Sequence, residues 1–257
     1  MPRIGFHSLQ VSNVRRLTEH AVCVSFDVPR ELAADFDFAP GQYLTIRAMV
    51  QGQRMLRRYS ICAPARSGTL QIGVKRRPEG RFSAYVVEQL RPGDVLDVMT
   101  PMGNFTADLR PDSERHYAAV AVGSGITPIR SIIMSVLAHE PHSRVTLLYA
   151  NRTRHSTMFR EDLDELHSRY RDRFEVVHVL SDDPLYQPAM PGRLDPDRLA
   201  EIVTARGLSS GVDLWFLCGP YELVEAFGGR LVEHGIELDA IRTESFEPAA
   251  ASAPRSS

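Results

Sequence analysis

The spacing of apolar residues changes once along the chain, and this change most constrains the fold. Before about residue 110, short stretches alternate apolar and polar residues between turn sequences that contain Gly and Pro. These stretches are Phe6–Val14, Ala21–Val28, Tyr43–Met49, Leu70–Val74 and Val95–Met99, with a sixth around Arg57–Cys62. Short alternating strands with tight turns favour a closed antiparallel barrel. One amphipathic segment, about Phe82–Leu90, predicts a helix among them.

Beyond about residue 116, apolar strands alternate with helical segments. The expected strands are Tyr117–Val122, Val145–Tyr149, Phe174–Leu180, Leu214–Leu217 and Ala240–Phe246. The expected helices are Pro128–Ala138, about Met158–Tyr170, Asp195–Ala205 and Tyr221–His234. This order predicts a doubly wound parallel sheet of the nucleotide-binding kind. The expected fold class is therefore β plus α/β, with a six-stranded antiparallel barrel at 1–111, an α/β domain at 112–247, and a disordered tail or truncated linker at 248–257.

Composition narrows the possible functions. The formal net charge is −2, which argues against a nucleic-acid partner, since such proteins usually carry a basic surface. The three cysteines are odd in number, far apart and without metal-ligand spacing, so neither a disulfide framework nor a metal site is expected within this chain. The chain has no long apolar run at its start and no membrane-length apolar segment. A cytoplasmic protein is the expectation.

The clearest local signal is the segment AVAVGSGITPIR. A buried strand ends at Val122, and Gly123 and Gly125 allow a tight turn before the next helix. Thr127 is expected to cap that helix, and Pro128 suits its first position. The start of a helix presents free backbone amides and a partial positive charge, which suit a pyrophosphate. An ordinary tight turn is the alternative.

The segment YANRTRH follows the second strand of this half, where selectivity for the adenosine ribose is decided. Asn151 and Arg152 lie here, followed by Arg154, whereas the first acidic residue after the strand is Glu161. Arginines at this place can hold a 2′-phosphate through charge-assisted hydrogen bonds. The sequence therefore favours NADPH over NADH. Because 29 of the 30 basic residues are arginines, solvated surface arginines remain an alternative.

A third turn follows the strand Leu214–Leu217 and reads Cys218-Gly219-Pro220. It falls at the carboxyl edge of the predicted sheet, where ligands bind in doubly wound folds. A lone cysteine is by default a buried core thiol. Its place at this edge makes Cys218 a candidate for contact with a reacting ring.

The segment RRYSIC places charge, an aromatic ring and a hydroxyl on one predicted strand. Alternation puts Arg57 and Tyr59 on one face and Ser60 on the other. An arginine can bind phosphates, the ring can cover a flat headgroup, and the hydroxyl can donate to it. All three reach one ligand only if that ligand crosses the end of the strand. An edge strand with solvated arginines is the alternative.

Six short motifs, which include these features, follow one another along the chain in a defined order. They are RRYS, the segment Gly80-Arg81-Phe82-Ser83, the turn PMGNF at 101–105, GSGITP, CGP and TESF, and they span about residues 5–247. Together they resemble the ferredoxin-NADP+ reductase superfamily. The segment YANRTRHSTMFR is most similar to the reductase components of oxygenases, such as those of phenylacetyl-CoA epoxidase and 3-ketosteroid 9α-hydroxylase.

The resemblance implies a flavin in the barrel, FAD more often than FMN, and implies a role for each matching residue. Arg57 would bind the flavin pyrophosphate, Tyr59 would stack on the ring, and Ser60 would hydrogen-bond near N5. Cys218 would lie beside the nicotinamide, and Glu244 would act near the flavin. The remaining cofactor-binding residues would be Lys75, Gly80, Arg81, Phe82, Ser83, Gly123, Gly125, Thr127, Pro128, Asn151, Arg152, Gly219, Pro220 and Phe246.

The implied reaction is hydride transfer from NAD(P)H to FAD, followed by single-electron transfer to a 2Fe-2S ferredoxin and a downstream oxygenase. The most similar reductases carry that ferredoxin as a C-terminal domain, but this chain has no C-x4-C-x2-C run. The carrier would then be a separate protein or a fused domain. Alternatives are a free-standing diaphorase that reduces quinones or ferric chelates, a flavin relay protein without turnover, and a colourless nucleotide-binding regulatory domain. The sequence does not indicate the oligomeric state.

Overall fold

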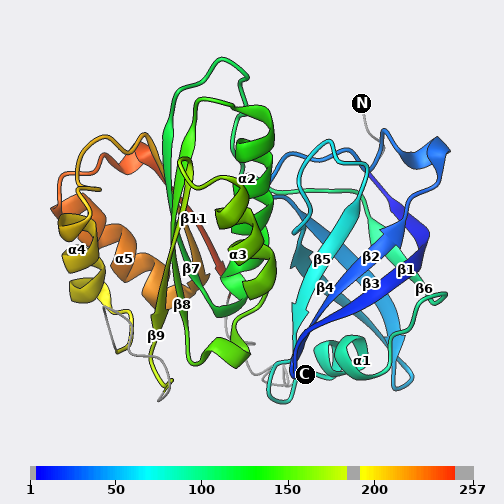
Figure 1. Ribbon diagram of the computed structural model, residues 1–257. Helices are drawn as coiled ribbons and strands as arrows, with labels where there is room; N and C mark the ends of the chain where they lie inside the picture. Colours follow the sequence, from blue (N-terminus) through cyan, green and yellow to red (C-terminus); the bar gives the residue numbers. More distant parts are fainter. Residues whose placement is uncertain (1–3, 184–191, 247–257) are drawn as a thin grey trace, which may run out of the picture.

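The first half of the chain folds into a curled antiparallel sheet. The computed structural model describes residues 4–183 and 192–246 (Figure 1). Six strands lie in the order β4-β3-β6-β1-β2-β5. They are β1 (Phe6–Thr18), β2 (Ala21–Asp27), β3 (Tyr43–Val50), β4 (Gln53–Ser60), β5 (Leu70–Lys75) and β6 (Val95–Met99). A bridge between Ile61 and Ile72 brings the chain after β4 beside β5, which confirms the predicted six-stranded barrel.

The interior of the barrel is apolar because every second residue of each strand points inward. One strand, β2, illustrates this, since Val22, Val24 and Phe26 pack into the barrel core. Helix α1 (Arg81–Glu88) covers one end of the barrel through Phe82 and Val86, which are buried in the same core. A short 3-10 helix, Arg30–Leu32, follows β2.

The second half forms a parallel five-stranded sheet, as predicted, and its strands lie in the order β11-β10-β7-β8-β9. The strands are β7 (His116–Val122), β8 (Arg144–Asn151), β9 (Phe174–Leu180), β10 (Leu214–Pro220) and β11 (Ile241–Phe246). Helices α2 (Ile126–His139) and α3 (Arg160–Arg169) lie between this sheet and the barrel, whereas α4 (Pro196–Ala205) and α5 (Tyr221–Glu233) cover its other face (Figure 1). Three short 3-10 helices complete the described part: Gly123–Gly125, Arg154–Ser156 and Leu238–Ala240.

The two halves share one hydrophobic core. Cys23, Cys62 and Phe105 from the barrel side are buried in the same cluster as Ile129 of α2 and Met158 before α3. Gly73 of β5 makes this contact close, because a Cβ there would lie 2.5 Å from the Thr127 methyl group. The barrel is therefore packed directly against the layer of helices that begins after the Gly123–Gly125 turn.

The predicted start of α2 is wrong by two residues, since this helix begins at Ile126 and not at Pro128. Thr127 does not cap α2, and Pro128 is its third residue, because the 3-10 turn Gly123–Gly125 continues directly into the helix. Gly125 already has helical dihedral angles, and the Thr127 hydroxyl donates to the Ser124 carbonyl at 3.0 Å instead of accepting from a free amide. The proline is tolerated because first-turn amides have no partner within the helix.

Other expectations concern the limits of the chain and of its domains. The division at residues 111 and 112 lies in the connection between β6 and β7 and stays a prediction. The tail predicted at 248–257 lies outside the described residues.

All three cysteines are free thiols. In the part of the chain that is described, no three His, Cys, Asp or Glu side chains gather as metal ligands, and no helix is long and apolar enough to cross a membrane.

Candidate functional site

Three of the predicted residues meet where the barrel touches the parallel sheet. Ser60 ends β4, and its hydroxyl donates to Glu244 Oε1 of β11 across 3.4 Å. Cys218 of β10 lies opposite Glu244 in the parallel register, so both side chains project from the same face of the sheet. The chain thus brings Ser60 and Glu244 together across 184 positions of sequence.

Burial sets the charge of this cluster. It raises the pKa of Glu244 to about 7, against the smaller lowering effect of the Ser60 hydroxyl. It also raises the pKa of the Cys218 thiol well above its usual value, and the Glu244 carboxylate adds to that shift. Glu244 Oε2 is buried and has no hydrogen-bond partner among the described residues. At neutral pH the cluster therefore holds a neutral thiol and a carboxyl group that can take up or release a proton.

Tyr59 faces the other side of β4, toward α1. Its ring centroid lies 6.0 Å from that of Phe82, and burial raises the pKa of its hydroxyl to about 12. Arg57 and Arg77 act against this rise, which places both cations near the ring. The faces of Tyr59 and Ser60 thus differ as predicted, and a ligand that contacts both must lie at the end of β4.

The first turn of α1 has the features of a backbone site for an anion. No side chain caps the amides of this turn. Ser83 Oγ donates to the Gly80 carbonyl at 2.9 Å and accepts from the Arg77 amide at 3.0 Å, which folds the loop back on the helix. A Cβ at Gly80 would lie 2.5 Å from Ser83 Oγ and 2.9 Å from Arg77 Cβ, so this loop requires glycine.

The Gly123–Gly125 turn and the end of β10 touch through glycines at the carboxyl edge of the parallel sheet. Cys218, Gly219 and Pro220, which the sequence predicted as a turn, are the last three residues of β10, because all three still pair with β11. A Cβ on Gly125 would lie 2.1 Å from the Cys218 carbonyl oxygen, and one on Gly219 would lie 2.9 Å from Val122 Cβ. Gly123 adopts a left-handed conformation with φ of 56°. The two predicted motifs are therefore parts of one site, in which the start of α2 is pressed against the end of β10.

Lys75 reaches this loop from the barrel. Its Nζ lies 3.9 Å from the position of a Cβ on Gly123. Burial lowers the pKa of the Lys75 amine, and the nearby Arg152 lowers it further. No carboxylate pairs with Lys75 in the described part of the chain. Two cations and the start of α2 thus converge on one small region, which favours a bound anion.

The structure adds acidic residues that the sequence analysis missed. Arg152 donates to Asp182 across 3.1 Å, and both the backbone amide and the side chain of Arg154 donate to Asp183. The carboxylates follow β9, the strand next to β8, so they are 30 positions away in sequence yet adjacent at the sheet edge. Next to them, the buried amide of Asn151 faces the Tyr149 hydroxyl without a hydrogen bond of normal geometry.

Comparison with known proteins shows the family to which this chain belongs. A model of the oxidoreductase FAD-binding domain matches residues 8–107, and one of the oxidoreductase NAD-binding domain matches residues 119–228. One component of the 1,2-phenylacetyl-CoA epoxidase from Escherichia coli is 36% identical over 241 residues, which cover 94% of this chain and 68% of that protein. This chain is an FAD- and NAD-binding oxidoreductase of the ferredoxin reductase type.

Other relatives support the same assignment. The ferredoxin reductase component of 3-ketosteroid-9-alpha-monooxygenase from Mycobacterium tuberculosis is 32% identical over 261 residues, covering 95% of this chain and 67% of that protein. The FAD/NAD-binding domain of nitric oxide dioxygenase from Vibrio cholerae superposes with a TM-score of 0.81 at 25% identity, over 96% of this chain and all of that one. The ferredoxin reductase of carbazole 1,9a-dioxygenase gives 0.76 at 26% identity, over 95% of this chain and 70% of that chain.

The residues of this ferredoxin reductase-type chain fit its two nucleotides. The glycine-lined turns leave backbone amides open to phosphates, Lys75 is a half-buried cation without a carboxylate, and Glu244 Oε2 is a buried oxygen without a partner in the described part. Gly123, Gly125 and Lys75 would hold the nicotinamide nucleotide. The first turn of α1, with Arg81 and Ser83, would hold FAD phosphates, as would Arg77, which the sequence analysis missed.

Most of the predicted residues of the reductase gather in these regions. Pro220 and Phe246 lie opposite each other where β10 and β11 end, next to the Cys218 and Glu244 pair. Thr127 and Pro128 lie buried in the first turn of α2. Arg57 is exposed, and its guanidinium donates to its neighbour's backbone, the Leu56 carbonyl, at 2.7 Å. Its role in FAD binding stays a prediction, as do the roles of the other site residues.

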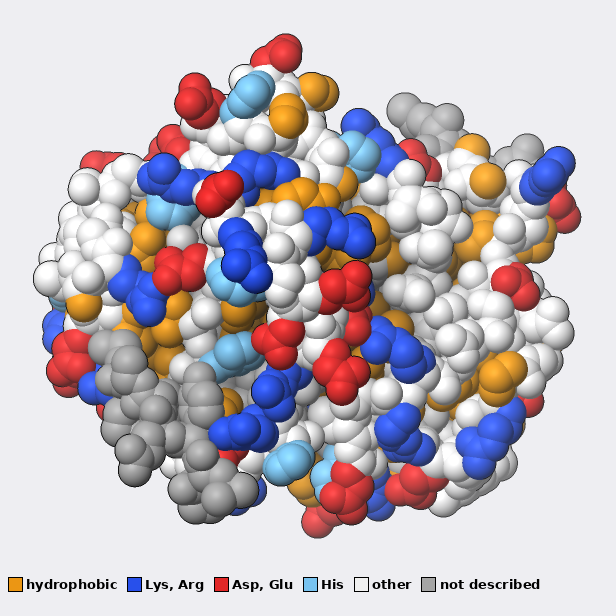
Figure 2. Space-filling model, viewed as in Figure 1, with side chains coloured by type: hydrophobic (Ala, Val, Ile, Leu, Met, Phe, Trp, Pro, Cys, Tyr) orange, Lys and Arg blue, Asp and Glu red, His pale blue; other side chains and the backbone are white. Residues whose placement is uncertain are grey.

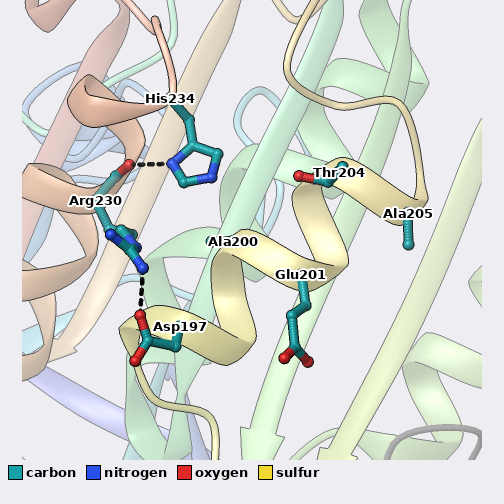
Figure 3. A pocket seen from close by; sticks show the side chains of 7 residues that line it. All are labelled: Asp197, Ala200, Glu201, Thr204, Ala205, Arg230 and His234. Carbon is teal, nitrogen blue, oxygen red and sulfur yellow. Dashed lines mark hydrogen bonds and ion pairs between the residues drawn. The ribbon is translucent and has the colours of Figure 1, made fainter.

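A groove of about 500 Å³ runs between α4 and α5, where Arg230 pairs with Asp197 and accepts a hydrogen bond from His234 at its carbonyl (Figure 3). The groove shares no residue with the cofactor regions. On the face shown in Figure 2, basic and acidic side chains are interspersed over both domains and form no basic stripe in the described part.

Proposed function

We propose that this reductase takes electrons from NAD(P)H and passes them singly to an iron–sulfur protein that serves an oxygenase. The names of the relatives from E. coli and M. tuberculosis support the oxygenase system, and the ferredoxin reductase of carbazole dioxygenase supports the iron–sulfur partner. The partner would be a separate ferredoxin or a domain fused to this chain. We place the protein in the cytoplasm, where its three free thiols stay reduced.

The contact between Ser60 and Glu244 carries this proposal. It joins the strand of the predicted flavin motif to the sheet edge that would hold the nicotinamide nucleotide. When bound, the flavin accepts a hydride from the nicotinamide and releases electrons one at a time. Ser60 would turn its single O–H from Glu244 to donate to the flavin. Glu244 Oε2 would hold or release a proton near pH 7, and the neutral Cys218 thiol would pack against the nicotinamide.

Ser60→Ala tests the first of these roles. Because hydride transfer requires close alignment, loss of the hydroxyl is expected to slow flavin reduction by about 10- to 100-fold with little loss of bound flavin. Anaerobic stopped-flow absorbance at the flavin band measures the rate. Ser8→Ala is the matched control, since Ser8 also donates to a carboxylate, Asp97, on the far side of the barrel. An unchanged reduction rate in Ser60→Ala would refute the role.

The identity of the electron acceptor needs a separate experiment. The purified protein is expected to be yellow and to bleach rapidly with NAD(P)H in the absence of oxygen. Reoxidation is then compared between a 2Fe-2S ferredoxin and a quinone or ferric chelate. Preference for the ferredoxin supports the oxygenase system, whereas equal turnover of all acceptors indicates a free-standing diaphorase. Slow bleaching in isolation indicates a relay protein, and a colourless protein contradicts the flavin assignment.

The choice between NADPH and NADH depends on two opposed groups at the sheet edge. Arg152 favours a 2′-phosphate, as predicted from the sequence, but Asp182 pairs with it and favours a free 2′-hydroxyl. Arg152→Ala is expected to raise the KM for NADPH more than that for NADH. Asp182→Asn is expected to change the ratio the other way, because it frees Arg152 and removes a repulsive charge.

Steady-state kinetics with both coenzymes measure this ratio, and Arg144→Ala at the opposite end of β8 is the matched control. We expect shifts of about threefold to tenfold in the ratio for an exposed pair such as Arg152 and Asp182. Equal changes for NADPH and NADH in both variants would remove these residues from coenzyme selection.

A further inference from the structure

A buried arginine on α2, the helix that follows the Gly123–Gly125 turn, connects this helix to the barrel. Arg130 lies on α2, is 7% exposed, and donates through Nη1 to the Cys62 carbonyl of the barrel. Its second terminal nitrogen, Nη2, donates to Asp162 Oδ2 of α3 at 2.8 Å. The guanidinium also lies over the Phe159 ring, 4.6 Å from its centroid. Arg130 is therefore fixed in orientation by contacts on three sides.

Asp162 receives a second arginine from the opposite domain. Arg15 of β1 donates to both of its carboxylate oxygens, at 3.0 and 2.8 Å. Burial alone would raise the pKa of Asp162, but Arg15 and Arg130 outweigh this effect and lower it. The carboxylate is thus charged at neutral pH. We call Arg15, Arg130, Asp162 and the Cys62 carbonyl the domain clamp.

The domain clamp links the two groups that the reaction must align. Cys62 lies two residues after Ser60, and Arg130 lies five residues after Gly125 on the helix that begins at the nucleotide loop. The two domains already share an apolar core, which supplies stability without fixed direction. A half-buried ion pair adds little to stability, because desolvation offsets the attraction. Planar guanidinium contacts do fix direction, since each hydrogen bond has a required angle.

We propose that the domain clamp sets the position of α2 relative to the Ser60 strand, so that Arg130 and Asp162 are positioning residues for hydride transfer. This inference rests on the proposed function. Hydride transfer requires the reacting atoms to approach to about 3–3.5 Å, and a displacement of about 1 Å can cost about 100-fold in rate. A small rotation of α2 against the barrel is enough to produce that displacement.

Asp162→Asn tests this proposal, because it keeps the shape of the side chain and removes the charge that both arginines share. At saturating NAD(P)H, the rate of anaerobic flavin reduction is expected to fall about tenfold or more. The Kd for the oxidised coenzyme, measured by flavin difference spectra, should rise by a clearly smaller factor than the rate falls, since Asp162 itself contacts no phosphate-binding group. Flavin content should equal that of the wild type.

Asp97→Asn is the matched control. Asp97 pairs with Arg47 at 3.0 Å and accepts from Ser8, but this ion pair lies within the barrel and does not cross to the other domain. It should leave the reduction rate unchanged. If Asp162→Asn does not fold, Arg15→Met replaces it, because Arg15 is 45% exposed and its removal leaves the pair between Arg130 and Asp162 intact. A smaller decrease of about threefold or more is expected there.

A second measurement separates this proposal from the proposed function. In the cofactor-free protein, amide hydrogen exchange at residues 61–63 and 126–130 should be faster in Asp162→Asn than in the wild type or in Asp97→Asn. A reduction rate within about twofold of the wild type overturns the positioning role, as does an equal loss in Asp97→Asn. A wild-type protein that neither coenzyme reduces contradicts the proposed function, and the exchange rates then still decide whether the domain clamp couples the domains.

Discussion

Gly125→Ala is expected to lower kcat/KM for NAD(P)H by at least about 100-fold while the barrel keeps its FAD. The added methyl group would lie 2.1 Å from the Cys218 carbonyl oxygen and 3.0 Å from the Gly219 amide nitrogen. Both are backbone atoms, so no side-chain rotation relieves the contact, and the start of α2 must move away from the end of β10. That movement displaces the amides and the Cys218 thiol that we propose to face the phosphates and the nicotinamide.

Two measurements check this prediction. Difference spectra with the oxidised coenzyme report binding, and thermal unfolding reports stability, which overpacking by about 1–3 kcal/mol would lower by several degrees. Gly229→Ala is the matched control, because Gly229 lies within α5 and a Cβ there would meet nothing within 4 Å. Normal coenzyme binding by Gly125→Ala would show that this close contact does not shape the nucleotide site.

Lys75→Met is expected to raise the Kd for the coenzyme by about 10- to 100-fold, which corresponds to a loss of about 1.4–2.7 kcal/mol. Lys75 is the cation that the barrel directs toward the Gly123 loop, and its half-buried position strengthens its attraction for a phosphate. Methionine keeps the unbranched shape of the side chain, is one atom shorter, and removes the charge with its hydrogen-bond donors. Flavin reduction at saturating coenzyme should stay within about threefold, since Lys75 does not touch the Ser60 and Glu244 pair.

Arg76→Met provides the control for charge. Arg76 is the next residue, but it pairs with Glu88 of α1 at 2.6 Å on the other side of the strand. Its removal changes the net charge of the protein equally and should leave the coenzyme Kd within about twofold. Coenzyme titrations at two salt concentrations complete the comparison, because the contribution of Lys75 should decrease as salt increases. Equal Kd values for Lys75→Met and Arg76→Met would exclude a specific phosphate contact.

The sequence predicts features that are local and misses those that depend on distant segments. The bounds of β9 are predicted residue for residue, because its mostly apolar run FEVVHVL stands between polar segments. The predicted start of α2 is wrong by two residues, since a 3-10 turn that continues into a helix leaves no separate capping signal. Thr127 has the chemistry of a cap but lies inside the first turn.

Most of the residues that the sequence analysis missed contact residues that lie far away in the sequence. Asp182 and Asp183 contact arginines about 30 positions earlier, and Asp162 contacts Arg15 across 147 positions. No spacing rule within one strand or helix identifies such pairs. Arg77 is the exception that a local rule could have found, because it lies one turn before the GRFS segment and close to Tyr59. Cations immediately before a helix that binds phosphates are expected from the same electrostatics.

The order of the strands has a consequence for synthesis of the chain. The barrel leaves the ribosome first, but its interface residues Cys23, Cys62 and Phe105 stay uncovered until α2 and α3 follow. Glu244 belongs to β11, which pairs only with β10 and comes last among the described strands. A nascent chain can therefore contain a barrel with the predicted flavin-binding residues before β11, which carries Glu244, has been synthesised. Such a chain is most prone to aggregation during this interval, because the apolar interface residues of the barrel are still exposed to solvent.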